Sequence, residues 1–174
     1  MITRRAMLHL GGLSGLALLS GCGFQPLYGQ QASGGAVSPE LAAIEINEIG
    51  EGTERRIGQI LKNELIDRFT AGQGRQPKRY RLLVEIDQST AALQIQSNDT
   101  VTRFNLALNA DFALYDSTSM TLLYSSTARA TGSYDVVESE YATLVAEQAT
   151  AEDAARDLSG TITNLLSLYF ARQG

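Results

Sequence analysis

Residues 104–114 read Phe-Asn-Leu-Ala-Leu-Asn-Ala-Asp-Phe-Ala-Leu, and every second residue from Phe104 to Leu114 is apolar. This alternation has the period of a β-strand with one buried face. Similar alternation occurs in residues 79–87 and 121–134, and a shorter run spans residues 43–49. Because turn residues rather than helical stretches separate the last three long runs, the sequence predicts three consecutive antiparallel strands.

The flanking strands carry more local detail. In residues 79–87 one face holds Tyr80, Leu82, Val84 and Ile86. The alternation resumes at Leu93 and Ile95, so the interruption at Ser89 to Ala92 predicts a bulge or a bend. Turns are expected at Asn98-Asp99 and from Asp116 to Met120.

The strand at 121–134 is rich in Ser, Thr and Tyr. Its expected core residues are Leu122, Tyr124, Ala128 and Ala130, with Ser125, Thr127, Arg129 and Thr131 outward. Two interpretations of this weakly charged outer face remain open: a contact surface for another protein and an ordinary solvated face.

Two segments have helical periodicity. After Thr53, a potential N-cap, one apolar stripe comprises Ile57, Ile60, Leu61, Leu65 and Phe69, and Gly72 and Gly74 close the helix. In residues 139–171 the stripe comprises Ala155, Leu158, Ile162, Leu165, Leu166 and Tyr169. Thr150-Ala151-Glu152-Asp153 resembles a capping box, and Gly160 is a weak point. Both one helix and two helices fit this segment.

These elements predict an α+β fold: a four-stranded, mainly antiparallel sheet with two helices packed on one face. An amphipathic helix must bury its stripe, and an antiparallel sheet offers one apolar face for it. Residues 40–174 are expected to form a single domain.

The N-terminus has the three parts of an export signal. Arg4 and Arg5 precede an apolar stretch, and Leu19-Ser20-Gly21-Cys22 resembles a bacterial lipobox. The expectation is a lipoprotein signal peptide over residues 1–21 and lipidation of Cys22. A buried Cys at the end of a membrane helix is the alternative, and export by the Sec or the Tat route stays open. Residues 22–39 form a lipidated N-terminus and a flexible tether.

The composition argues against catalysis. The chain of 174 residues has one Cys and one His, and removal of residues 1–21 takes away the His and changes the net charge from −5 to −7. The remaining chain has no His base for a nucleophilic triad, no phosphate-binding glycine loop and no metal-ligand set. We therefore expect no enzyme, no catalytic residues, no metal and no cofactor. The acidic total also argues against nucleic acid as a partner.

The charges are polarised along the chain. Residues 55–81 contain eight basic and two acidic residues, whereas residues 104–174 contain three basic and nine acidic ones. The densest basic run extends from Arg75 to Arg81. It suits an anion site, or it is solvated loop charge that protects an edge strand from aggregation.

The motif Gly21-Cys22-Gly23-Phe24, continued by residues 25–29 (Gln-Pro-Leu-Tyr-Gly), resembles the LPS-assembly lipoprotein LptE family in its alphaproteobacterial form. Further similar positions are Asp99, Thr102-Arg103, Leu106, Tyr141 to Leu144, Ala146-Glu147 and Arg156 to Leu158. The resemblance covers most of the chain after residue 21, and its element order is also that of the family.

The resemblance implies an outer-membrane lipoprotein that lies in the lumen of the LptD β-barrel as plug and assembly partner in lipopolysaccharide transport. Outer-membrane lipid would hold acylated Cys22, and Gly23 agrees with outer-membrane sorting. Lipopolysaccharide phosphates suit Arg side chains. On charge and position the candidates for that contact are Lys78, Arg79, Arg81 and Arg103.

Two other functions compete with this one. The first is an unrelated periplasmic lipoprotein that binds a ligand or peptide in an apolar pocket. The second is a carboxylate-based hydrolase, which needs a cleft holding two acids about 5–10 Å apart.

Overall fold

The computed structural model describes residues 39–71, 76–95 and 101–173. The expected signal peptide, Cys22, Gly72, Gly74, Arg75 and the turn at Asn98-Asp99 lie outside these ranges. Pro39, expected to end the tether, already begins a helix. The elements are α2 (Pro39–Ala42), β1 (Ile44–Ile46), the 3₁₀ helix η1 (Gly52–Glu54), α3 (Arg55–Thr70), β2 (Tyr80–Ile95), β3 (Val101–Asp116), β4 (Leu122–Asp135) and α4 (Glu140–Ala171).

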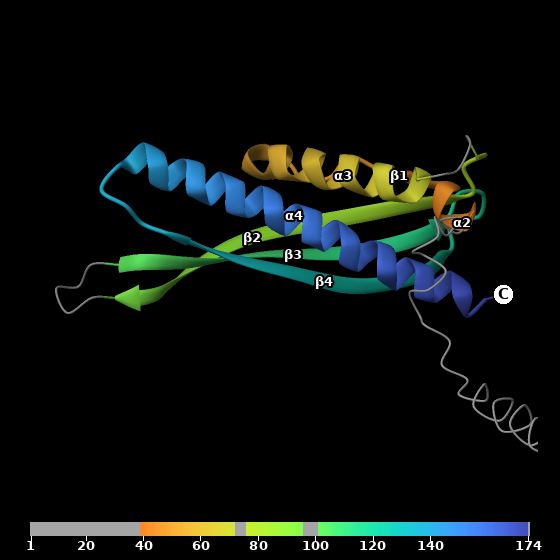
Figure 1. Ribbon diagram of the computed structural model, residues 1–174. Coiled ribbons are helices and arrows are strands. Elements are labelled where there is room, and N and C mark those ends of the chain that lie inside the picture. The colour runs from red at the N-terminus through yellow and green to blue at the C-terminus, as the bar shows by residue number, and fades with distance from the viewer. Residues whose placement is uncertain (1–38, 72–75, 96–100, 174) are drawn as a thin grey trace, which may run out of the picture. The chain divides into compact units, whose positions relative to one another are not determined.

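The four strands form one sheet in the order β1-β2-β3-β4 (Figure 1). β1 pairs with β2 in parallel, and the other neighbours are antiparallel. The register places Tyr80 opposite Asp116 and Phe104 opposite Tyr134. The expected α+β class and the mainly antiparallel sheet are confirmed.

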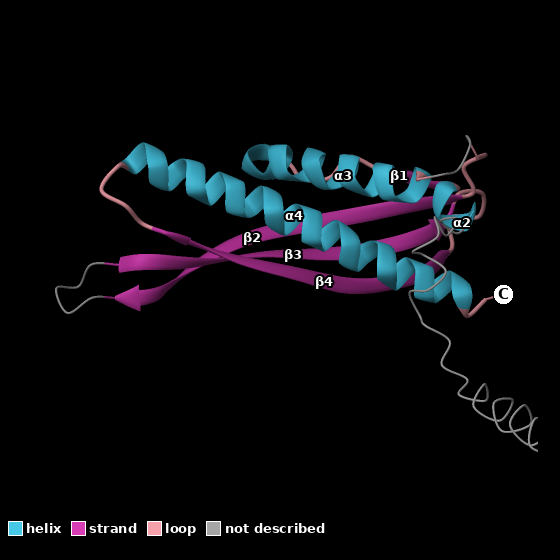
Figure 2. Ribbon diagram, in the orientation of Figure 1, coloured by secondary structure: helices cyan, strands magenta, loops and turns pink. Residues whose placement is uncertain are grey.

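α3 and α4 cover the same face of the sheet, as Figure 2 shows. That face carries the even-numbered residues of the long strands, so the alternation in 104–114 becomes a row of buried side chains: Leu106, Leu108, Ala110, Phe112 and Leu114. The helices contribute Leu61, Leu65, Phe69, Leu158, Ile162 and Leu166 to the same core. Burying one such Leu or Phe side chain stabilises the fold by about 1.5–3 kcal/mol.

One expectation about the strands is displaced and one is wrong. The irregularity expected at Ser89 to Ala92 lies just beyond that stretch: β2 is continuous through it, and its register with β3 shifts between Ala92 and Gln94 and again between Gln94 and Ile95. Leu122 is not a core residue, because 51% of it is exposed. A register shift between β3 and β4 pairs Leu122 with Tyr115 and displaces it from the row that continues at Tyr124.

Residues 140–171 form one helix, which settles the open choice. Thr150 does not cap a helix there, because its hydroxyl donates to the Ala146 carbonyl one turn earlier, at 2.8 Å. The N-cap is Ser139, whose hydroxyl accepts from the Ala142 N–H. The N-cap of α3 is Glu54 rather than Thr53, because η1 precedes the helix.

Candidate functional site

Lys78 lies at the start of β2, where its ammonium group holds two separate segments together. The Nζ atom donates to the Ala42 carbonyl at 3.0 Å and to the Ile44 carbonyl at 2.8 Å. Those carbonyls belong to the last residue of α2 and the first residue of β1. Lys78 therefore fixes the chain where it enters the sheet, and its charge is directed toward the protein's own backbone.

Arg79 and Arg81 share this end of the sheet. The Arg79 guanidinium lies 5.3 Å from the centre of the Tyr80 ring, which is cation–π geometry. Arg81 reaches Glu45 at 3.9 Å, and its Nε is buried with no hydrogen-bond partner among the described residues. Ser117 Oγ is unpartnered in the same way, and the Ser117 N–H donates to the Arg79 carbonyl. This end therefore offers two guanidinium groups to a ligand, whereas the Ser117 hydroxyl is buried.

Arg103 lies far from these residues. It faces Gln94 in the β2–β3 register, thirteen positions beyond Arg81, or about 40 Å along the strand. Arg103 binds Asp135 through two hydrogen bonds of 2.7 and 3.2 Å. The ion pair raises the pKa of Arg103 and lowers the pKa of Asp135. The structure thus brings Lys78, Arg79 and Arg81 together and separates Arg103 from them.

The sheet face opposite the helices is polar and holds one shallow hollow of about 400 Å³. Glu85 and Asp111 line it and face each other across β2 and β3. Cβ atoms of such a pair lie about 4.5–5.5 Å apart. Both side chains are exposed, however, whereas a catalytic acid depends on burial to keep its proton at neutral pH. Within the described residues, no group of three or more potential metal ligands comes together.

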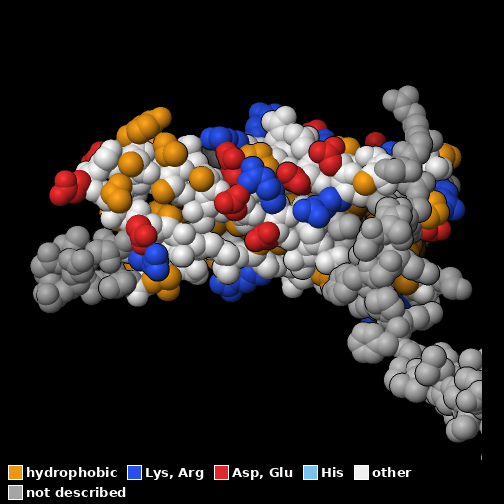
Figure 3. Space-filling model, viewed as in Figure 1, with side chains coloured by type: hydrophobic (Ala, Val, Ile, Leu, Met, Phe, Trp, Pro, Cys, Tyr) orange, Lys and Arg blue, Asp and Glu red, His pale blue; other side chains and the backbone are white. Residues whose placement is uncertain are grey.

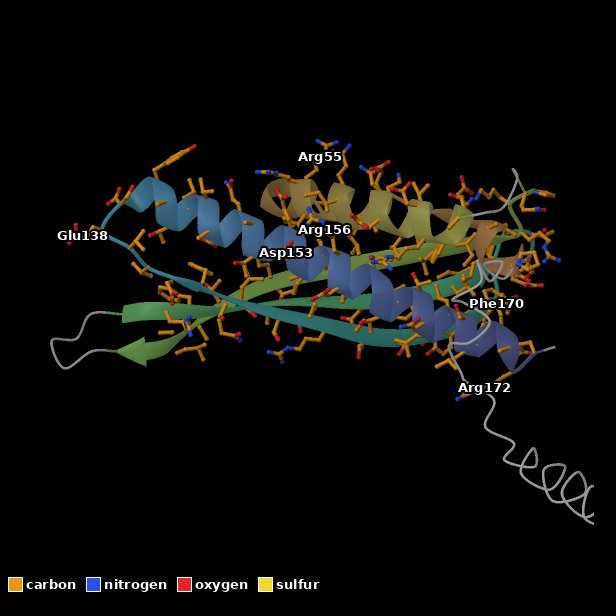
Figure 4. All side chains as sticks on the ribbon, viewed as in Figure 1. Arg55, Glu138, Asp153, Arg156, Phe170 and Arg172 are labelled. Atoms are coloured by element: carbon orange, nitrogen blue, oxygen red, sulfur yellow. The ribbon has the colours of Figure 1, made fainter. Side chains whose placement is uncertain are left out.

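A few of the polarised charges meet each other between the two helices. On α4, Arg156 pairs with Glu64 of α3 and with Glu152 and Asp153 of its own helix, and it lies beside Asp153 in Figure 4. Arg56 of α3 also reaches Glu152, at 2.6 Å. Part of the basic segment 55–81 is therefore neutralised inside the fold rather than offered to a ligand.

An apolar group at the start of α4 was not predicted from the sequence. Val137, Tyr141, Leu144 and Val145 are exposed, and Tyr141 is 77% accessible. In Figure 3 hydrophobic side chains gather over this end of the molecule. The signal was available as a helical stripe in residues 137–145, but the order of elements alone does not show that α3 begins opposite Gln148 and leaves the first turns of α4 uncovered.

None of the helices in the described residues is both long and apolar enough to cross a membrane.

A family model described as "LptE: Lipopolysaccharide-assembly" matches residues 41–166. A search of curated proteins gives no match. Among solved structures, a lipoprotein of Caulobacter crescentus CB15 is 25% identical, with a TM-score of 0.60; the alignment covers 79% of this chain and 97% of that one.

Two more distant structures share the fold. Rare lipoprotein B from Shewanella oneidensis is 8% identical, with a TM-score of 0.54, and the alignment covers 74% of this chain and 98% of that one. Lipoprotein B from Nitrosomonas europaea is 17% identical, with a TM-score of 0.53 and coverage of 74% and 83%. The matched region runs from α2 to the last turns of α4, so it includes the whole sheet and both long helices.

Proposed function

The chain belongs to the LptE lipopolysaccharide-assembly family, and we propose that it is an outer-membrane lipoprotein that plugs and helps assemble the LptD β-barrel. In this role it supports delivery of lipopolysaccharide to the cell surface and carries out no catalysis itself. The observation that carries the proposal is the family match over residues 41–166, which spans nearly the entire described body.

The anchor in this proposal is Cys22, acylated after removal of residues 1–21. Each buried acyl CH₂ contributes about 0.8 kcal/mol, so several chains hold a protein firmly at a membrane. Sixteen residues lie between Cys22 and Pro39, where α2 begins. Such a segment reaches at most about 60 Å when fully extended. Replacement of Cys22 by Ala should abolish the acyl mass adduct and move the protein from membrane to soluble fractions.

The surface opposite the helices suits a barrel lumen. Outer-membrane barrels have polar interiors, and a plug must match them. On this face β3 and β4 present short polar side chains, among them Asn105, Asn109, Ser125 and Thr127. The hollow there is open and shallow, a poor shape for enclosing a small ligand, which favours a contact with a protein surface over the alternative of a ligand-binding lipoprotein.

For lipopolysaccharide, the contact we favour lies at the Arg79 and Arg81 end. Phosphate accepts paired hydrogen bonds from guanidinium groups, and both guanidinium-bearing side chains here are accessible: Arg79 is exposed, and 38% of the Arg81 side chain is accessible. Lys78 would act there by holding the backbone, and Arg103 would act separately or not at all. The double substitution Arg79→Ala/Arg81→Ala should weaken binding of purified lipopolysaccharide by about tenfold, the loss of one charge-assisted hydrogen bond. Arg103→Ala is the matched control, with a smaller effect.

The deciding experiment is affinity purification of the full-length protein from detergent-solubilised membranes. The proposal expects a large β-barrel protein in stoichiometric amount. Depletion of the protein should also reduce correctly folded barrel and surface lipopolysaccharide. Unchanged barrel folding and unchanged surface lipopolysaccharide after depletion would contradict the proposed role.

A further inference from the structure

The two edge strands of the sheet differ in length and in the charged side chains around them. β1 has only three residues, and charged side chains lie around it, including the Glu45–Arg81 and Glu48–Lys62 pairs. Short length and charge are the usual protections of a sheet edge. β4 has fourteen residues and forms the other edge, with β3 as its only neighbour among the described strands (Figure 1).

The hydrogen-bond pattern identifies the backbone groups on that free edge. The Ser117 N–H donates to the Arg79 carbonyl, so odd-numbered residues of β2 and β3 form the hydrogen-bonded pairs. In an antiparallel ladder, hydrogen-bonded pairs alternate with non-hydrogen-bonded pairs. The even-numbered residues of β3 therefore do not bond to β2, and their backbone N–H and C=O groups point toward β4. Since these residues pair with even-numbered residues of β4, such as Ala110 with Ala128, the odd-numbered residues of β4 point their N–H and C=O groups outward.

These outward residues are Ser125, Thr127, Arg129, Thr131 and Ser133, and all five side chains are exposed. They are short apart from Arg129, and the strand has no Pro. Between Leu122 and Asp135 the only charge is Arg129. Along this stretch β4 therefore lacks the bulges and prolines that block strand pairing and carries a single charge, and it presents a regular row of donors and acceptors.

We propose that the β4 edge accepts an extended segment of the barrel partner, which adds to the sheet as a fifth strand beside Ser125 to Ser133. This inference rests on the proposed function. The segment must lie outside the closed barrel wall, whose backbone groups are already paired. It carries an Asp or Glu opposite Arg129 and otherwise small neutral residues. In strand addition the affinity comes mainly from main-chain hydrogen bonds. This mode of binding suits the β4 edge, where the side chains are short and mostly uncharged.

A second copy of this chain fits the edge less well. The antiparallel two-fold register that uses all five outward residues places Arg129 of one copy opposite Arg129 of the other. Like charges directly opposite each other destabilise a strand pair. An acidic residue on a different protein removes this conflict, and for that reason we commit to a heterologous strand.

The test uses proline in the full-length, acylated protein. Thr127→Pro/Thr131→Pro removes two outward N–H groups but no hydrogen bond to β3, so the fold should survive, as proline is tolerated on edge strands. The matched control is Thr127→Ala/Thr131→Ala, which changes the side chains and keeps both N–H groups. With thermal unfolding unchanged, recovery of the barrel should fall about tenfold for the proline variant and remain normal for the alanine variant. Equal recovery with both variants overturns the edge proposal and leaves the proposed function standing.

Photo-crosslinking supplies a second, geometric readout. A benzophenone amino acid at position 125 and one at position 133, each in its own variant, should label the same continuous segment of the barrel protein. The two labelled positions on that segment should lie about eight residues apart, because two paired strands have the same rise per residue. Crosslinks scattered over distant parts of the barrel, or a crosslinked homodimer, overturn the proposal. If the unsubstituted protein recovers no barrel protein in the affinity purification, that result overturns the proposed function and also the barrel as the source of the added strand.

Discussion

Replacement of Gly58 by Ala should destabilise the fold, although the same change is favourable in most helices. Gly58 lies in α3, where the chain that leaves β1 passes directly over it. A Cβ atom on Gly58 would lie 1.9 Å from the Ile49 carbonyl oxygen and 2.5 Å from its carbon. Both neighbours are backbone atoms, so no rotation of a side chain relieves the contact.

The expected magnitude follows from three contributions. Ala improves the helix by about 1 kcal/mol over Gly. Overpacking costs about 1–3 kcal/mol, and the required shift is large because ordinary contacts begin near 3.4 Å. Moving the Ile49 backbone also exposes its side chain, which is now 2% accessible, at up to about 1.5–3 kcal/mol. The net loss is about 1.5–5 kcal/mol, or roughly 3–20 °C in Tm for a domain of this size.

Gly160→Ala in α4 is the matched control. There the new Cβ would meet only the Arg68 guanidinium, with Nη1 at 3.8 Å and Cζ at 3.9 Å, which are ordinary contacts. This variant should gain up to about 1 kcal/mol, so Gly160 is a weak point that the fold does not require. Urea unfolding followed by circular dichroism, on a chain that begins at Gly23, gives both midpoints. A Gly58→Ala midpoint equal to or above that of the unsubstituted chain would refute the reasoning.

Three further outcomes are open to measurement. Lys78→Met keeps the aliphatic stem but removes both carbonyl contacts, so it should lower the free energy of unfolding by about 1–3 kcal/mol in urea titration, and hydrogen exchange near β1 should accelerate. Gly132→Ala places a Cβ 2.5 Å from Thr150 Cγ2 and should destabilise; Thr150→Ser, which deletes that methyl group, should restore much of the loss in a double-mutant cycle. The backbone N–H groups of Ser119 and Thr118 lower the pKa of Asp116. The ionised carboxylate therefore stabilises the fold above the ordinary Asp pKa, and this stabilisation is lost as the pH falls through the lowered pKa. In Asp116→Asn, the urea midpoint should consequently fall less steeply as the pH is lowered.

Local patterns predicted the layers of the fold correctly. The alternation from Phe104 to Leu114 was decisive because one face of β3 is buried under both helices and the other is solvated. The stripe at Ile57 and Leu61 was equally reliable, since those residues pack on the same core. Where one face is buried along its whole length, the period in the sequence directly reflects the packing.

Long-range contacts explain what the sequence did not reveal. The sequence alone does not distinguish Lys78 from the other basic residues of its segment. Its carbonyl partners lie more than thirty residues earlier in the chain, so no local pattern reveals them. The sequence of a capping box does not by itself identify the start of a helix. A threonine inside a helix fits the same sequence when its hydroxyl donates to a carbonyl one turn earlier, as Thr150 does. Nothing local marks β4 as a sheet edge either, because strand order follows from how the whole chain packs.

The placement of β1 has a consequence for the order of folding. β2, β3 and β4 pair with neighbours in sequence, and such hairpins close quickly because the loops are short. β1 pairs with β2 across 36 residues, from Ile44 to Tyr80, with α3 in between. The meander should therefore form early, and β1 should dock late, once α3 has packed on the sheet. In the lipoprotein proposed above, the part of the domain that orders last would then be the part nearest the lipid in sequence, while the β4 edge is already available for pairing.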